Sequence, residues 1–143
     1  MTEAERRAIE ADCTRLIHLY ANLNDAGRWA EVAALYTAQG SLARPTAPDA
    51  PLVGRQAILD AFVARPPRVT RHVVANVVVT VASATEASAF SVVLLFSGGG
   101  TGVGLPVLDT GAPLVGTFAD RLVLTDQGWR FAERRGGLDF RRA

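Results

Sequence analysis

The chain has 143 residues and a net charge of +1, and 49% of its residues are hydrophobic while 20% are charged. This composition is typical of a globular protein and excludes a disordered chain, and the near-neutral charge provides no general attraction for nucleic acid. The length suits one domain, residues 1–143, with a sizeable hydrophobic core.

The N-terminal segment, MTEAERRAIEAD, carries charges where a signal peptide needs an apolar stretch. No segment approaches the ~20 consecutive apolar residues that a membrane span requires. We therefore expect a cytoplasmic protein that does not use a membrane as a partner.

The first half of the chain has the apolar spacing of helices. Thr2 and Glu5 can form a capping box at the start of a long helix that ends near 24–27. Its expected buried stripe consists of Ile9, Cys13, Leu16, Ile17, Tyr20 and Leu23. A shorter second helix is expected to carry Trp29 through Tyr36, and a third covers 54–67, where two prolines stop it. Between these, 41–54 contains three prolines and predicts a short strand followed by a loop.

After residue 69 the apolar period changes to two, which predicts strands over roughly 70–82, 85–97, 114–125 and 129–135, with a weak extension toward 140. The glycine-rich stretch 98–111 predicts a mobile connection close to a pocket. It lacks the lysine and hydroxyl residue of a phosphate-binding loop. Helices followed by a strand meander indicate the α+β class, with helices packed on one face of a mainly antiparallel sheet.

The strand TRHVVANVVVTV has two faces of different character. One face reads His72, Val74, Asn76, Val78 and Thr80, an apolar surface with polar groups set into it, as in a pocket lining. The other face reads Val73, Ala75, Val77, Val79 and Val81. A contiguous apolar face of this size predicts a homodimer or a higher homo-oligomer.

Only two histidines exist, and the helical wheel places His18 toward solvent. His72 is either a pocket residue or a core histidine satisfied by a backbone carbonyl. Asp25 can equally be a turn residue or a helix N-cap, and Tyr20 can simply pack in the core. Asn76 can orient a substrate oxygen or be a satisfied interior amide.

The remaining reactive groups favour ordinary structural roles. Cys13 lies on the buried stripe of the first helix and is expected to be a core residue. Arg134 and the other arginines near the C-terminus are expected on a solvated strand edge. With His72 the only inward imidazole, no metal site is expected.

The order of elements, together with YANLNDAGRWAEVAALYT, LVGRQAILDAF, TRHVVANVVV and GTFADRLVLTDQGWRFAERR, resembles the SnoaL-like branch of the NTF2-like superfamily. The resemblance implies a cone-shaped α+β barrel, in which three helices are wrapped by a curved sheet around an apolar pocket. In dehydratases and a dehydrochlorinase of that superfamily, an aspartate after the first helix pairs with a histidine on the strand after the third. The matching positions here are Asp25 and His72, and Tyr20 matches an auxiliary tyrosine. The second histidine of scytalone dehydratase has no counterpart, and Asn24 stands where that enzyme has a tyrosine.

The resemblance implies a cofactor-independent lyase or isomerase that acts on a small hydrophobic, oxygenated cyclic molecule. Asp25, His72 and Tyr20 are then the catalytic candidates, and Asn76, Trp29, Phe62 and Val74 the substrate-binding candidates. The alternative is a non-catalytic ligand-binding or assembly module of the same fold. A dioxygenase β-chain is disfavoured because such chains are longer.

Overall fold

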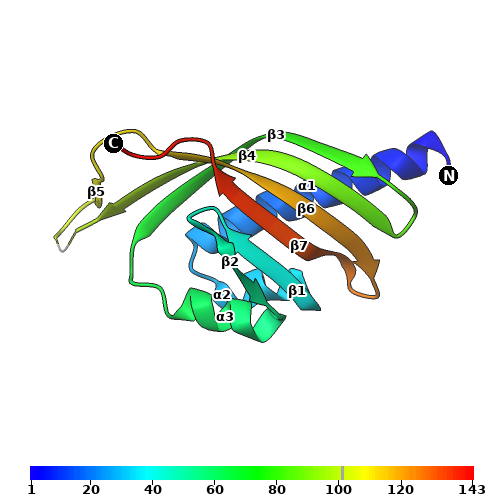
Figure 1. Ribbon diagram of the computed structural model, residues 1–143, viewed down its shortest axis with the longest axis horizontal. Coiled ribbons are helices and arrows are strands. Elements are labelled where there is room, and N and C mark those ends of the chain that lie inside the picture. The colour runs from blue at the N-terminus through cyan, green and yellow to red at the C-terminus, as the bar shows by residue number, and fades with distance from the viewer. Residues whose placement is uncertain (101) are drawn as a thin grey trace.

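The computed structural model describes residues 1–100 and 102–143. A strongly curved sheet forms the body of the protein (Figure 1). Its strands are β1 (Tyr36–Arg44), β2 (Ala47–Val53), β3 (Val69–Val81), β4 (Glu86–Gly99), β5 (Val107–Leu108), β6 (Leu114–Thr125) and β7 (Gly128–Leu138). They follow the order β2-β1-β7-β6-β4-β3, and β5 pairs with β4. All neighbouring strands are antiparallel except β1 and β7. The mixed, mainly antiparallel sheet and the α+β class agree with the prediction.

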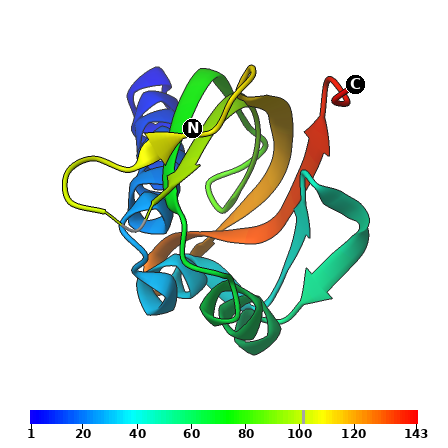
Figure 2. The ribbon, with the colours of Figure 1, turned by 90° about the vertical axis from the view of Figure 1, so that its left-hand side faces the viewer.

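The three helices are α1 (Glu3–Asp25), α2 (Trp29–Ala34) and α3 (Arg55–Val63). The predicted capping box is present, because the Glu5 amide donates to Thr2 Oγ1 at 3.1 Å and the Thr2 amide donates to the Glu5 carboxylate at 2.7 Å. Figure 2 shows the sheet curling from β3 round to β1, with α1 along β3 and with α2 and α3 at one end. The concave side of the sheet therefore faces the helices.

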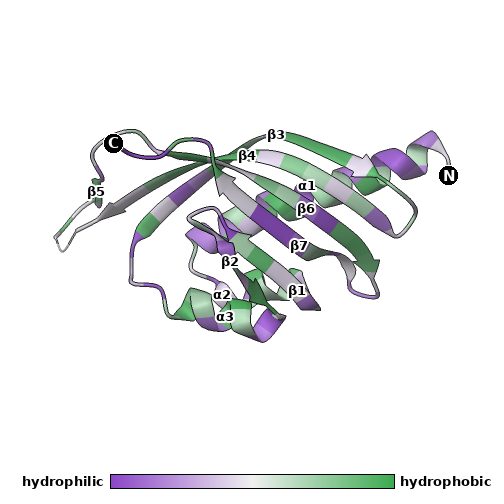
Figure 3. Cartoon of the chain, in the orientation of Figure 1, coloured by the Kyte–Doolittle hydropathy of each residue, from purple (hydrophilic) through white to green (hydrophobic). Residues whose placement is uncertain are grey.

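The buried stripe of α1 packs into the core with Leu122 and Phe131 of β6 and β7. Cys13 belongs to that stripe, and burial raises the pKa of its thiol to about 12, so it is a core residue and not a reactive nucleophile. The first two turns of α1 are exposed and hydrophilic, and they extend past the sheet (Figure 3).

Two boundaries in the first half differ from the prediction. Tyr36 does not belong to the second helix; it is the first residue of β1 and is fully buried. The segment expected to be a loop contains β2, in spite of Pro48 and Pro51. Proline is tolerated there because β2 is an edge strand that pairs only with β1. Neither proline is among the β2 residues that pair with β1, so the absence of their amide hydrogens costs no strand-pairing hydrogen bond.

The glycine-rich stretch is more structured than expected. Gly98 and Gly99 continue β4 and pair with Leu108 and Val107 of β5. A close approach explains the first glycine, because a Cβ on Gly98 would lie 2.5 Å from the Val107 carbonyl oxygen. Thr101, which the expected connection includes, lies outside the described residues. The mobility of this connection stays a prediction.

A β-bulge in β3 overturns the predicted alternation of its faces. Asn76 has φ of 53°, and the register with β4 shifts between Ala75 and Val78. One extra residue reverses the facing of everything after it. Val77 and Val79 therefore pack against the core, whereas Val78 is 62% exposed. The predicted outer face is thus wrong beyond the bulge.

We still propose self-association through the outer face of the sheet, with corrected residues. Val73, Val78 and Phe90 are exposed there on the neighbouring strands β3 and β4, and Phe90 is 49% exposed. Phe90→Asp should shift the protein from dimer to monomer at micromolar concentration, because a buried unpaired charge is costly. Size-exclusion chromatography with light scattering measures the mass.

Val53→Asp is the matched control, since Val53 is similarly exposed but lies on the opposite edge strand, β2. Wild-type protein that stays monomeric at every concentration would contradict the proposal.

Candidate active site

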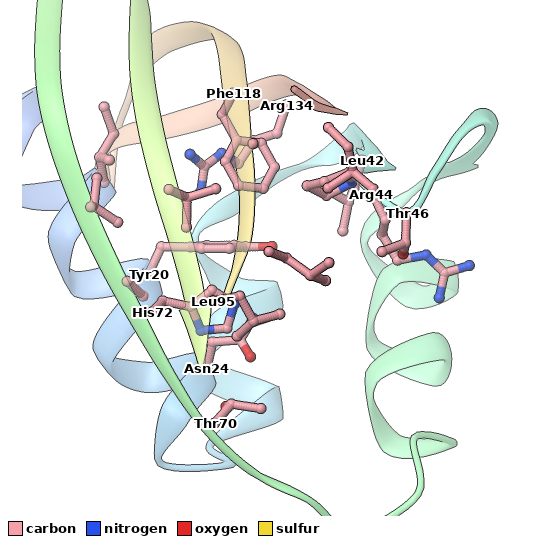
Figure 4. Close-up of a pocket in the computed structure, with 18 of the residues that line it drawn as sticks. Tyr20, Asn24, Leu42, Arg44, Thr46, Thr70, His72, Leu95, Phe118 and Arg134 are labelled. Atoms are coloured by element: carbon pink, nitrogen blue, oxygen red, sulfur yellow. The ribbon is translucent and has the colours of Figure 1, made fainter. Parts of the chain in front are cut away.

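A cavity of about 280 Å³ lies between α1, the end of β1, α3 and the concave face of the sheet. Its apolar lining residues are Ile17, Ala21, Leu42, Pro45, Phe62, Val74, Val93, Leu95, Leu114, Phe118 and Leu138. Its polar lining residues are Tyr20, Asn24, Arg44, Thr46, Arg65, Thr70, His72 and Arg134. In Figure 4, Tyr20, His72 and Asn24 lie on one side, and Leu42, Arg44 and Thr46 lie on the other. The cavity is thus mostly apolar, with polar groups on facing walls, which is typical of a small-molecule site.

Asp25 and His72 are in direct contact at one wall of this cavity. Asp25 Oδ1 lies 2.5 Å from His72 Nδ1, although the two residues are far apart in the chain. The Asp25 carboxylate is 2% exposed, whereas the His72 side chain is 17% exposed and lines the cavity. Because a carboxylate accepts, we assign the proton to Nδ1, which leaves Nε2 free to accept a proton.

Further donors from β3 hold the Asp25 carboxylate in place. Thr70 Oγ1 donates to Oδ1 at 2.9 Å, and the backbone amide of His72 donates to Oδ2 at 2.8 Å. The exposed Arg71 guanidinium lies 3.5 Å from Oδ2. Burial alone would raise the pKa of Asp25, but the hydrogen bonds from His72 and Thr70 outweigh it and lower the pKa. Asp25 therefore stays ionised and can orient the imidazole.

Tyr20 lines the same cavity as His72, the imidazole of the Asp25–His72 dyad. It reaches the cavity from α1, five residues before Asp25, and its hydroxyl lies 2.8 Å from that of Tyr36 on β1. Burial raises the pKa of Tyr20 and, more strongly, that of Tyr36. Both phenols therefore keep their protons at neutral pH and act as hydrogen-bond donors.

Arg134 is a cavity residue that the sequence reasoning placed wrongly in solvent. Its side chain is 2% exposed and forms a two-point ion pair with Asp120, with distances of 2.7 Å and 3.1 Å. The guanidinium also lies over the rings of Phe118, at 4.0 Å, and of Tyr20, at 4.5 Å. Burial alone would lower the pKa of Arg134, but the Asp120 carboxylate outweighs it and raises the pKa, so a positive charge persists in the cavity wall.

A second bulge explains the error at Arg134. Arg121 pairs with Glu133 and Leu122 pairs with Phe131, so Ala132 is an extra residue in β7. It brings Phe131 and Arg134 to the same inner side although they are three residues apart. One feature of the sequence could have indicated that Arg134 is buried. Phe118 and Asp120 lie two residues apart on β6 and face the same inner side, and a buried aspartate needs a cation as its partner.

The substrate-binding candidates divide into two groups. Phe62 and Val74 line the cavity, as expected. Trp29 does not line it; the indole stacks on Phe62 with ring centres 5.3 Å apart. Asn76 is exposed and outside the cavity, because the bulge turns it away from the face of His72. His18 is exposed on α1, in agreement with the prediction.

Two further findings concern the described residues. Within 1–100 and 102–143, no group of three or more histidine, cysteine, aspartate or glutamate side chains is arranged to hold a metal ion. None of the helices in this part of the chain combines the length and apolar character needed to cross a lipid bilayer.

Removal of the Asp120 carboxylate should leave the Arg134 charge buried without a partner. We expect Asp120→Ala to lower the free energy of unfolding by about 3–5 kcal/mol. Urea denaturation followed by circular dichroism measures this change. Glu133→Ala is the control, because Glu133 pairs with the exposed Arg135 and should cost less than about 1 kcal/mol. Equal losses in both variants would contradict the assignment.

The lowered pKa of Asp25 predicts a pH-dependent contribution to stability. A carboxyl group with a lowered folded-state pKa stabilises the fold above its unfolded-state pKa of about 3.9 and loses this contribution as the pH falls through the folded-state value. The stability difference between wild type and Asp25→Asn should therefore be largest above about pH 4 and shrink in stronger acid. Urea unfolding from pH 3 to pH 7 tests this, and a difference that does not vary with pH would contradict it.

Solved structures with the same fold include a protein from Novosphingobium aromaticivorans that carries the provisional name scytalone dehydratase. It is 21% identical, with 99% of this chain and 94% of that chain covered at a TM-score of 0.80. A type 2 hexachlorocyclohexane dehydrochlorinase is 15% identical over 97% of this chain and 90% of its own, with a TM-score of 0.77. A Catenulispora acidiphila protein in complex with S-DNPA is 22% identical over 93% and 95%, with a TM-score of 0.70.

None of the curated proteins matches the chain by sequence. The SnoaL-like domain, in contrast, matches residues 5–135, which is nearly the whole chain. This agrees with the three helices and curved sheet, with the NTF2-like fold of similar structures, and with the resemblance seen in the sequence. The chain belongs to the family of SnoaL-like domains.

Proposed function

We propose that the protein is a cofactor-independent lyase or isomerase acting on a small hydrophobic, oxygenated cyclic molecule. The observation that carries the proposal is the 2.5 Å contact between Asp25 and the His72 imidazole, whose other edge borders the cavity. His72 acts as the general base, and Asp25 fixes its tautomer and its orientation. One similar structure is named as a dehydrochlorinase and another carries the provisional name scytalone dehydratase, and both names agree with this class of reaction.

The reaction begins with transfer of a proton from a carbon atom of the substrate to Nε2 of His72. The electron pair of the broken C–H bond passes into an adjacent carbonyl group as an enolate. Where a C=C bond is conjugated with the enolate, return of the proton to the far carbon of that bond gives isomerisation, whereas loss of a group from the β-carbon gives elimination. His72, now an imidazolium beside the Asp25 carboxylate, supplies the proton in either case.

The cavity wall suits the negative charge that develops in such a step. The Tyr20 hydroxyl is an un-ionised donor backed by Tyr36, and the Arg134 guanidinium supplies a fixed positive charge. Pre-oriented donors in an apolar surrounding stabilise an enolate more strongly than water does. We therefore assign Tyr20 as the auxiliary donor, Arg134 as an electrostatic contributor, and Phe62 and Val74 to the apolar contact with the substrate.

A second candidate function is a non-catalytic module that binds a small ligand. The predominantly apolar lining of the cavity favours it as well, and a similar structure is a complex with S-DNPA. The two candidates differ in whether the His72 imidazole is needed for turnover or only for the shape of the cavity.

Exchange of the α-protons of 2-tetralone in D₂O, followed by proton NMR, tests the base directly, because exchange needs only C–H proton abstraction. His72→Ala should slow the enzymatic exchange by about 10²–10⁴-fold. Asp25→Asn should also be slow, and the double variant should be scarcely slower than His72→Ala, because the two residues act as a unit. Acidification should slow the wild type, since the imidazole must be neutral to accept a proton.

His18→Gln is the matched control, because His18 is exposed on the outer side of α1 and should leave the exchange rate unchanged. Circular dichroism verifies that each variant folds. Exchange no faster with wild type than with folded His72→Ala would overturn the catalytic proposal and favour the ligand-binding module.

A further inference from the structure

Two arginines, Arg44 and Arg65, line the same cavity as the dyad but have no part in the proton transfer described above. Arg44 is the last residue of β1, and Arg65 follows the C-terminal end of α3. These segments are 21 residues apart in the sequence, and the fold brings both arginines to the lining of one cavity.

Neither arginine has an acidic partner in the part of the chain that the structure describes. The ion pairs formed by residues 1–100 and 102–143 leave out both Arg44 and Arg65. In addition, the buried Nε of Arg44 has no hydrogen-bond acceptor among these residues. Arg134 differs in this respect, because its charge is matched by Asp120. The buried Arg44 Nε costs free energy unless a ligand supplies an acceptor, whereas Arg65 is exposed and its guanidinium is open to a ligand.

Aromatic and amide groups hold Arg65 beside the dyad. Its guanidinium carbon lies 4.3 Å from the centre of the Phe62 ring, and Nη1 lies 3.5 Å from Asn24 Oδ1. Asn24 precedes Asp25 in the chain and also lines the cavity. Desolvation lowers the pKa of the Arg65 guanidinium, and the charge of Arg44 lowers it further, so the two groups repel each other across the cavity.

We propose that Arg44 and Arg65 form a carboxylate-binding subsite, and that the ligand of this cavity is a cyclic apolar molecule with one carboxylate group. A carboxylate matches the planar fork of a guanidinium, accepts from the unpaired Arg44 Nε, and relieves the repulsion between the two cations. The ring then contacts the apolar lining, and the fixed carboxylate sets which carbon faces His72. The inference rests on the proposed function only in assigning this cavity to the substrate.

A matched pair of ligands tests the charge requirement. 2-Naphthoate and 2-naphthamide have nearly the same shape but differ in charge at neutral pH, and isothermal titration calorimetry measures their affinities. The carboxylate should bind wild-type protein about 10- to 100-fold more tightly, as expected for hydrogen bonds between charged groups. Arg44→Gln and Arg65→Gln should each reduce this preference, and the double variant should abolish it.

Arg15→Gln serves as the control, because Arg15 is an exposed arginine on the outer side of α1 and should leave the preference intact. His72→Gln should also keep the preference while losing proton exchange, which separates the two proposals. If His72→Gln loses exchange but the wild type shows no preference for the carboxylate, the subsite is overturned while the proposed function stands. Equal affinity of wild type for the two ligands, no measurable binding of 2-naphthoate, or a preference that survives in the folded double variant would each overturn the subsite.

Discussion

The Asp25 carboxylate joins the C-terminal end of α1 to the beginning of β3 through the His72 ring, the His72 amide and the Thr70 hydroxyl. These bonds compensate the cost of removing a carboxylate from water. They also hold an edge strand, because β3 pairs only with β4 and otherwise relies on its contact with α1. The same contacts that fix one wall of the cavity thus position the imidazole, so the structure of this wall and the proposed chemistry depend on one side chain.

A second buried charge also lies in the cavity lining. Arg134 extends from β7 into the cavity, and Asp120 on the neighbouring strand β6 neutralises it. The rings of Phe118 and Tyr20 cover the guanidinium and keep it from water. In the proposed reaction, the paired but persistent positive charge beside Tyr20 suits an anionic intermediate, because its donors need no reorganisation during the reaction. The proposed roles thus assign proton acceptance to His72 and stabilisation of negative charge to Tyr20 and Arg134.

In our proposal, Arg44 and Arg65 give the cavity a third feature, which concerns recognition and not the chemical step. Most of the lining is apolar and can accept many ring systems with similar affinity. Directional bonds to a charged group remove that ambiguity, because they fix the ligand in one orientation. Members of one fold can differ in substrate through such peripheral groups while sharing the same central arrangement.

Sequence periodicity and the capping box determined the helices, the four long strands and the α+β class, because these depend on local spacing. The resemblance to SnoaL-like proteins pointed to Asp25 and His72. The facing of His72 could be predicted because Thr70 and His72 lie on one face of β3, before its bulge. Only the tertiary structure decided the facing of Asn76 and Arg134. Each lies at or beyond a bulge, and a single extra residue reverses every later side chain of a strand. A bulge is set by the partner strand's register, which the alternation of apolar residues along one strand does not encode.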